Sequence, residues 1–223
     1  MARIAKKPGT YHHGDLRRVL LDAAVHVVEK EGVGALSLVA IAKKAGVSSG
    51  APYHHFESRE ELLSAIAVEG FDLLTAAMKE GAAESAAHAH AGESQGEAEL
   101  RGLGRGYMRF ALAHRGHFRI MFRPELKGSL SKEKQAVARE SFDLLRAGID
   151  RCQREGTLAP GDPKALVLLS WSAIHGAAVL WNDGALSREG LLADGDSLGA
   201  LMADTLLMAL RRERPPQKSK RRP

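Results

Sequence analysis

The chain has little of what a disulfide-bonded or membrane-embedded protein needs. Cys152 is the single cysteine among 223 residues, so no disulfide can form within the chain. Such sparing use of cysteine fits a reducing compartment, and we expect a cytoplasmic protein. Arg3, Lys6 and Lys7 precede no apolar segment of the kind found in a signal peptide. No apolar run approaches the length of a membrane span, so we expect a soluble protein with no membrane partner.

Aromatic residues are also scarce, at 5% of the chain, and no segment alternates between apolar and polar residues as a half-buried strand does. Alanine, leucine and charged residues dominate instead, and these residue types favour helices. A chain of this length can bury a substantial core. The sequence therefore predicts an all-α fold, arranged as one domain or two small ones.

The net charge of +5 is unevenly distributed along the chain. Residues 1–20 contain five lysines and arginines against one acid, and residues 211–223 contain seven against one. The segment between them is net acidic, unlike a protein that binds nucleic acid with its whole surface. We expect the basic N-terminal arm to contact phosphates. The tail, residues 213–223, is expected to be disordered and solubilising.

Residues 37–56 predict two short helices joined by a tight turn. The first helix starts after the candidate N-cap Ser37 and ends before Gly46, which can adopt the positive φ of a helix end. Its inner face is formed by residues at helical spacing: Leu38, Ile41, Ala42 and Ala45. Ser48 is expected to cap a second helix of about two turns, which tolerates Pro52 near its start. A helix this short is unstable alone, and placing it in the major groove of DNA is the usual reason for one.

Helical periodicity extends on both sides of this motif. We expect one helix from Asp15 to Lys30 and another from Ser58 to about Met78, opened by a capping box between Ser58 and Glu61. Residues 81–96, rich in Ala, Ser, Gly and Glu, predict a frayed helix end and a loop. Further helices are expected at about residues 97–111, 114–122, 131–154, 162–184 and 197–212.

Four segments resemble the tetracycline-repressor (TetR) family of bacterial transcription regulators: Tyr11–Leu16, Ala45–Ser48, Tyr53–Phe56 and Ser58–Leu63. A later segment, Trp171–Gly176, is similar to the Trp…His-Gly motif of a C-terminal subclass called WHG. The resemblance implies a helix-turn-helix DNA-binding domain over residues 14–74. It also implies a larger C-terminal helical domain over residues 75–212, for ligand binding and dimerisation.

The resemblance implies a ligand-responsive repressor that binds palindromic double-stranded DNA as a homodimer. A small, mostly apolar effector would release it from that DNA. Gly50 and Ala51 are small enough for close approach to the groove, and Tyr53 and His54 can donate to base edges or phosphates. The full set of candidate DNA contacts is Ser37, Ser48, Ser49, Gly50, Ala51, Tyr53, His54 and Arg59.

Trp171 and His175 lie four residues apart and project from one face of an apolar helix. Members of the family that this chain resembles hold an effector within the C-terminal bundle. These two residues, with Phe110 and Phe122, are therefore candidate pocket-lining residues. The alternative is a core tryptophan and a buried, hydrogen-bonded histidine. The sequence leaves both interpretations open.

Metal and cysteine chemistry have weaker support. His12, His13, His88 and His90 lack the rigid ligand spacing of zinc sites, so we expect no metal and no cofactor. Cys152 lies close to Arg151 and Arg154, which would lower a thiol pKa and permit oxidant sensing, although a passive cysteine is the simpler interpretation.

Catalysis also lacks support. Ser170, His175 and Asp183 lie on one helix and cannot converge, and no Gly-x-Ser-x-Gly motif is present, so we do not expect an enzyme. One alternative of another class stays open, a binding or scaffold protein whose helix-turn-helix is unused. Sequence-specific retention of palindromic DNA at moderate salt would distinguish a regulator from that alternative.

Overall fold

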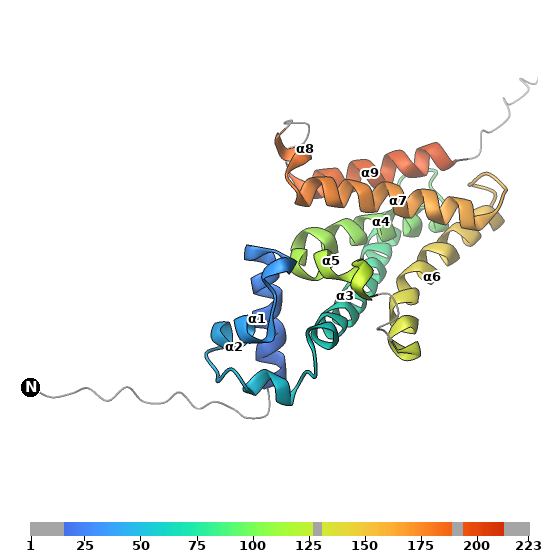
Figure 1. Cartoon of the computed structure of the whole chain (residues 1–223). Coiled ribbons are helices and arrows are strands. Elements are labelled where there is room, and N and C mark those ends of the chain that lie inside the picture. Colours follow the sequence, from blue (N-terminus) through green and yellow to red (C-terminus); the bar gives the residue numbers. More distant parts are fainter. Residues whose placement is uncertain (1–15, 127–130, 189–193, 212–223) are drawn as a thin grey trace, which may run out of the picture.

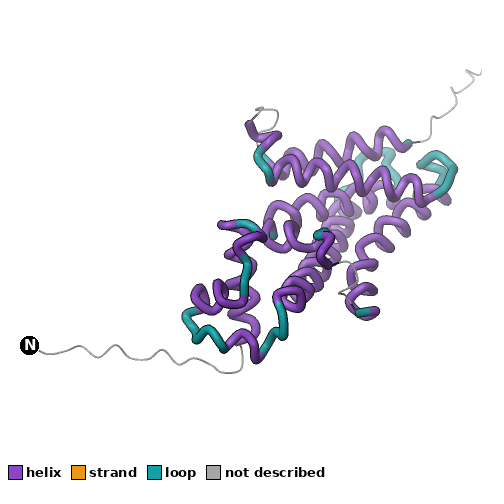
Figure 2. Tube along the Cα trace, viewed as in Figure 1, coloured by secondary structure: helices purple, strands orange, loops and turns teal. Residues whose placement is uncertain are grey.

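The computed structural model describes residues 16–126, 131–188 and 194–211. Within these ranges every regular element is helical and none is a strand, which confirms the all-α prediction (Figure 2). A small N-terminal unit and a larger bundle share one long helix, α3 (Arg59–Ala87), which runs from one to the other (Figure 1). The basic arm before residue 16 and the tail after Arg211 lie outside the described residues.

The N-terminal unit consists of α1 (Leu16–Glu31), α2 (Leu38–Ala45) and the start of α3, joined by the short turns η1 (Val33–Ala35) and η2 (Ala51–His54). The apolar stripe of α1 packs against α2 and α3 as its periodicity predicts. The fully buried side chains of this core include Leu20, Val28, Ile41, Phe56, Leu62 and Ile66. The unit therefore has a core of its own.

The predicted ends of α2 are confirmed. The Ser37 hydroxyl accepts a hydrogen bond from the backbone N–H of Ala40 at 3.1 Å, which satisfies a free donor at the helix start. Gly46 has φ of 70°, the left-handed conformation that ends a helix and favours glycine. Local chemistry thus fixes where this helix begins and ends.

Helix α3 packs closely on α4 (Gln95–Ala113), which corrects the helix end predicted near residue 81, whereas the predicted loop is present at residues 88–94. A β-carbon added at Gly102 would lie 2.2 Å from the carbonyl oxygen of Gly81. One added at Gly106 would lie 2.2 Å from the carbonyl oxygen of Ala77. The two backbones touch, and only glycine permits that distance. The small residues that resembled a loop composition instead mark a helix–helix contact, so α3 is helical to Ala87.

The remaining helices agree with the predicted segments within a few residues, apart from the unpredicted short α8. They are α5 (Arg115–Met121), α6 (Lys132–Arg154), α7 (Pro163–Asn182), α8 (Ala185–Arg188) and α9 (Gly195–Leu210), with a short turn η3 (Pro124–Leu126) after α5. The last long helices, α7 and α9, lie side by side on the bundle (Figure 1).

Helix α7 is the one helix among the described residues that is long and apolar enough, by length and composition alone, to cross a bilayer. Its most apolar 18-residue window has a mean hydropathy of 1.4 and is 22% buried. Ser170, Ile174 and Ala178 face the bundle, whereas Leu168 and Leu180 face outward. The expectation that no apolar run reaches this length was therefore wrong. The outward side of α7, beside α9, is thus an exposed apolar face.

Candidate nucleic-acid interface and internal cavity

The second helix of the helix-turn-helix is a single 3₁₀ turn, η2, and not the two-turn helix that we expected. Ser48 does not cap it, because η2 begins after Gly50 with no side-chain cap. The backbone N–H groups of His55 and Phe56 both donate to the carbonyl oxygen of Pro52 at 2.9 Å. This tight turn returns Phe56 to the core, where it is 1% exposed, and leaves too few residues for a longer helix.

The candidate DNA contacts on this turn lie together at the surface. Ser48, Ser49 and Gly50 are exposed, and Ala51 is half-buried. Tyr53 is 56% exposed and His54 is exposed beside it, whereas His55 is half-buried. The turn therefore presents an aromatic ring, an imidazole and a small-residue patch to solvent.

Two exposed lysines next to this turn were missed at the sequence level. Lys43 and Lys44 occupy the last turn of α2 and point to solvent. Their signal in the sequence is a pair of cations in the last turn of the first helix of the motif, separated from Gly46 by one residue. Cations at this position suit phosphate contacts.

Arg59 and Ser37 have structural roles in addition to the expected DNA contacts. The role of Ser37 is to cap the start of α2, as described above. The Arg59 guanidinium donates to the carbonyl oxygen of Leu36 through Nε at 2.9 Å and to that of Val33 through Nη2 at 3.0 Å. It thereby fastens the start of α3 to η1, and only its other N–H groups can reach a phosphate.

The predicted capping box between Ser58 and Glu61 forms in shifted register. Ser58 accepts from the Glu61 N–H, but Glu61 accepts from the N–H of Glu57.

A cavity lies within the larger bundle, with walls from α3, α4, α6, α7 and α9. The cavity is small in this arrangement of the helices, with about 50 Å³ of space into which water-sized atoms fit; the volume is about 670 Å³ only when gaps along the walls and open solvent at the mouth are included. Its walls are mostly apolar, and Arg101 is the one charged residue among the described residues that line it. Phe122 and Trp171, two of the four candidate pocket residues, are part of these walls.

The other two candidates, Phe110 and His175, lie outside the walls. Phe110 is 1% exposed and stacks on His114, with ring centroids 5.4 Å apart. His175 lies behind the wall, with its Nδ1 2.8 Å from the Tyr107 hydroxyl and its ring 4.6 Å from that of Phe122. Of the two interpretations of Trp171 and His175, pocket lining therefore applies to one residue and core packing to the other. Trp171 lines the cavity, and His175 is a hydrogen-bonded packing residue.

Burial lowers the pKa of two imidazoles, His175 and His117. His117 lies on α5 with neither ring nitrogen hydrogen-bonded to the described residues, and its Nε2 is 3.6 Å from a carboxylate oxygen of Glu69. The folded state therefore keeps His117 neutral at pH values where the unfolded chain, with a pKa of about 6.5, binds a proton.

The free energy of unfolding should consequently fall as the pH drops below about 6.5. Urea titrations at pH 7.5 and 5.5 will measure this loss. We expect the loss to be smaller in His117→Gln, because the variant has no imidazole to protonate, and unchanged in His54→Gln, which removes an exposed imidazole. A His117→Gln variant with the full wild-type loss would contradict this account.

The oxidant-sensing hypothesis for Cys152 is wrong. The side chain is fully buried, and burial raises the pKa of its thiol to about 12. Arg151 does not activate it, because its guanidinium pairs with Glu99 and Glu155. Cys152 is a neutral core residue.

The structure gives no support to a metal site in the part of the chain it describes. There, no group of three or more His, Cys, Asp or Glu side chains could hold an ion. His88 contacts its own helix, with Nδ1 3.0 Å from the carbonyl oxygen of Glu84. His12 and His13 lie outside the described residues.

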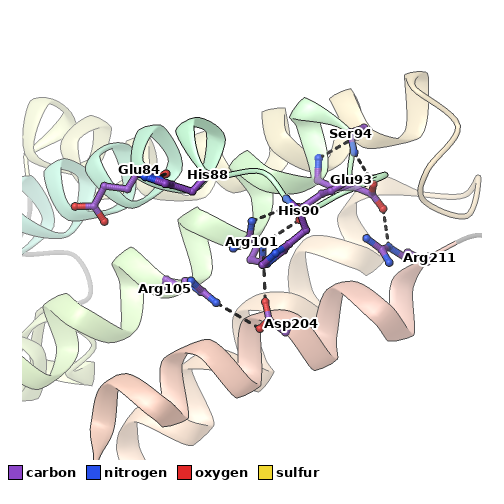
Figure 3. Close-up of polar contacts among 10 residues, drawn as sticks. Glu84, His88, His90, Glu93, Ser94, Arg101, Arg105, Asp204 and Arg211 are labelled. Atoms are coloured by element: carbon purple, nitrogen blue, oxygen red, sulfur yellow. Dashed lines mark hydrogen bonds and ion pairs between the residues drawn. The ribbon is translucent and has the colours of Figure 1, made fainter.

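A buried ion pair fastens the connection between α3 and α4 to the bundle (Figure 3). Arg101 donates through Nε and Nη2 to the two carboxylate oxygens of Glu93, at 2.9 and 2.8 Å. Both side chains are 3% exposed. Asp204 of α9 lies 3.9 Å from the Nε of Arg101 and 3.4 Å from Arg105, so α9 joins the same network (Figure 3).

Two family models match this chain. One, described as bacterial regulatory proteins of the tetR family, matches residues 20–66. The other, described as a tetracyclin repressor-like C-terminal domain, matches residues 100–206. The first match spans the helix-turn-helix, and the second spans most of the cavity walls. The narrower WHG resemblance is not addressed by these matches and stays a prediction.

Two relatives match parts of the chain. YobS, a helix-turn-helix-type transcriptional regulator of Bacillus subtilis, is 26% identical over 47% of this chain and 50% of its own length. AcrR, a regulator of the same type from Shigella flexneri, is 42% identical over 23% of this chain and 24% of its own length. The aligned regions thus span half or less of these curated relatives.

Solved structures match over more of the chain. A Rhodococcus protein of unknown function is 35% identical, with 92% of this chain and 100% of that chain covered and a TM-score of 0.74. The TetR-family regulator PfmR of Thermus thermophilus is 22% identical, with 86% and 99% covered and a TM-score of 0.67, which shows the shared fold. Regulators of this kind form a non-enzymatic class with a DNA-binding helix-turn-helix domain. With both family models matched in order on this all-α fold, the chain belongs to the TetR family of transcriptional regulators.

Proposed function

We propose that this cytoplasmic protein is a repressor that binds a palindromic operator as a homodimer and is released by a small effector. The observation that carries the proposal is the exposure of Tyr53 and His54 on a turn anchored by buried Pro52 and Phe56. The turn holds these side chains in place without using them for packing. Such a rigid, projecting polar pair suits direct contact with base edges.

The other DNA contacts would follow from the same docking. Gly50 and Ala51 admit close approach to the groove, and Ala51 suits contact with a thymine methyl group. Ser37, Ser48 and Ser49 would donate to phosphates, together with the free N–H groups of Arg59. Lys43 and Lys44 extend this phosphate-contacting set.

Tyr53→Ala and His54→Ala should each weaken binding to a selected operator while leaving the fold intact. Both side chains are exposed, so their removal leaves no cavity and the melting temperature should stay near wild type. Loss of a good base contact corresponds to about 1–3 kcal/mol, which is roughly 5- to 150-fold in affinity. Fluorescence anisotropy with the operator and with random DNA will measure the effect.

Leu16→Ala is not a suitable control for this experiment, since Leu16 packs on the core of the unit. Arg146→Ala is the better control, because it removes an exposed side chain from α6 in the distant bundle. Wild-type operator affinity in both the Tyr53 and His54 variants would refute the groove assignment.

Binding to a palindrome requires two copies of the turn. In a dimer, two reading elements must lie about 34–36 Å apart to enter successive major-groove turns. The outward apolar faces of α7 and α9 supply a surface on which a second copy can pack, and Leu201 and Met208 belong to it. Leu206 lines the cavity instead of this face.

Effector release would act through α3. Leu74 and Met78 of this helix line the cavity, and its first turns carry the N-terminal unit. Helix α5 adds a second link, because the Gly116 N–H donates to the Glu29 carboxylate at 3.3 Å and Arg119 donates to carbonyl oxygens of α1. An effector that binds better to one arrangement of α3 and α5 would shift the separation of the two reading elements.

A further inference from the structure

The polar groups of the cavity walls are few, and most already have partners. The Tyr107 hydroxyl is paired with His175, and Ser141 donates weakly to the carbonyl oxygen of Ala138 at 3.5 Å. Ser170 differs from both. It is 4% exposed, it lines the cavity, and its hydroxyl has no hydrogen-bond partner among the described residues. A buried hydroxyl without a partner is costly and calls for one.

Trp171, next to Ser170 in the chain, adds a second polar group to the same wall. Its indole N–H is buried and lies near the Tyr107 hydroxyl without making a hydrogen bond of ordinary geometry. An indole N–H can only donate, whereas a serine hydroxyl can donate or accept. An oxygen acceptor of a ligand is therefore a suitable partner for either group.

The cavity has no free charge to offer a ligand. Arg101 is the one charged residue among the described residues that line the cavity. Its Nε and Nη2 already donate hydrogen bonds to the carboxylate of Glu93. Burial raises the pKa of Tyr107 and lowers that of His175, so both rings stay neutral near pH 7. A carboxylate or ammonium group bound here would lose its hydration without gaining an opposite charge, which is strongly unfavourable.

We propose that the effector of this cavity is a neutral, mainly hydrocarbon molecule whose oxygen acceptor, such as a ketone, ester or alcohol oxygen, binds Ser170 and Trp171. The inference rests on the proposed effector site and adds the chemical class of the ligand and its polar anchor. The apolar side chains from five helices would surround the hydrocarbon part, and because the cavity holds about 50 Å³, they must move apart to admit it.

Four ten-carbon probes test the class: 2-decanone, 1-decanol, decanoate and decylammonium, each at pH 7.5. Binding is measured by the shift in melting temperature and by tryptophan fluorescence of the full-length protein. The ketone and the alcohol should raise the melting temperature and bind, whereas both ions should bind at least tenfold more weakly. Binding of either ion as tight as that of the ketone, or no binding by any probe, would overturn the proposal.

Ser170→Ala tests the anchor. Loss of one hydrogen bond to the ketone should weaken its binding by about tenfold. Ser172→Ala is the matched control, because Ser172 lies on the same helix but is exposed on its opposite side. Equal ketone affinity in Ser170→Ala and wild type would refute the anchor. Because operator binding is measured separately, ketone binding without release from DNA would support the ligand class and contradict only the effector role.

Discussion

Replacing Arg101 with methionine is expected to lower the free energy of unfolding by about 3–5 kcal/mol. The substitution keeps an unbranched side chain of comparable length but removes the guanidinium that pairs with Glu93. Glu93 is 3% exposed, so its carboxylate would stay buried without a cation within reach. Chemical denaturation monitored by circular dichroism measures the loss. A pair this deeply buried is not itself strong evidence of net stabilisation, but breaking one side of it is costly.

Arg105→Met provides the matched control for this prediction. Arg105 lies one turn further along α4 and pairs with Asp204, but that ion pair is partly exposed, with side-chain exposures of 34% and 48%. Pairs of this kind contribute about 0–1 kcal/mol. The double variant Glu93→Gln, Arg101→Met should regain much of the stability lost in the single variant, since no buried charge is left. A double variant no more stable than Arg101→Met would contradict the proposed cause.

The fold was predictable where the signal is local. Caps and helix ends are written in a few adjacent residues, so Ser37, Gly46 and the Asp162–Pro163 start of α7 lie where the sequence placed them. The apolar stripe of α1 is equally local. These features depend on backbone hydrogen bonding and periodicity, which the chain specifies without reference to distant residues.

The features that the sequence did not predict depend on contacts between distant segments. Gly81 resembled a loop residue because its partner, Gly102, is unrelated to it in local sequence. Glu93 and Arg101 form the buried pair across a connection that carried no visible signal. The two-turn helix expected after Ser48 is shortened by the need to bury Phe56, a tertiary requirement that overrides local propensity.

The candidate sites divide in the same way. Exposure of Tyr53 and His54 followed from a short helix with one inward aromatic residue, and this much was predictable. The cavity was only half predictable, because helical spacing places Trp171 and His175 on one face but cannot tell a wall from the layer behind it. The unpartnered hydroxyl of Ser170 becomes visible only when five helices are assembled around it.

Leu201→Glu and Met208→Glu should each convert the protein to monomers and weaken operator binding by about 10²- to 10⁴-fold. The decrease reflects loss of the effective concentration that links two half-site contacts. Leu201 is 51% exposed and Met208 67% exposed in the single chain, beside outward leucines of α7 that are 49–60% exposed. Packed against a second copy, these positions would become desolvated, and an unpaired carboxylate there costs several kcal/mol. Light scattering and anisotropy with the operator measure the two effects.

These substitutions separate dimerisation from folding, because the same side chains face solvent in one chain and glutamate is tolerated there. The helical circular dichroism of both variants should therefore match that of wild type. Ala147→Glu adds the same charge at an exposed position of α6, away from the α7–α9 face, and should stay dimeric with wild-type operator affinity. Dimers that persist in both variants would move the interface elsewhere on the bundle. Monomers with undiminished affinity would show that one turn alone carries recognition, which the small area of η2 argues against.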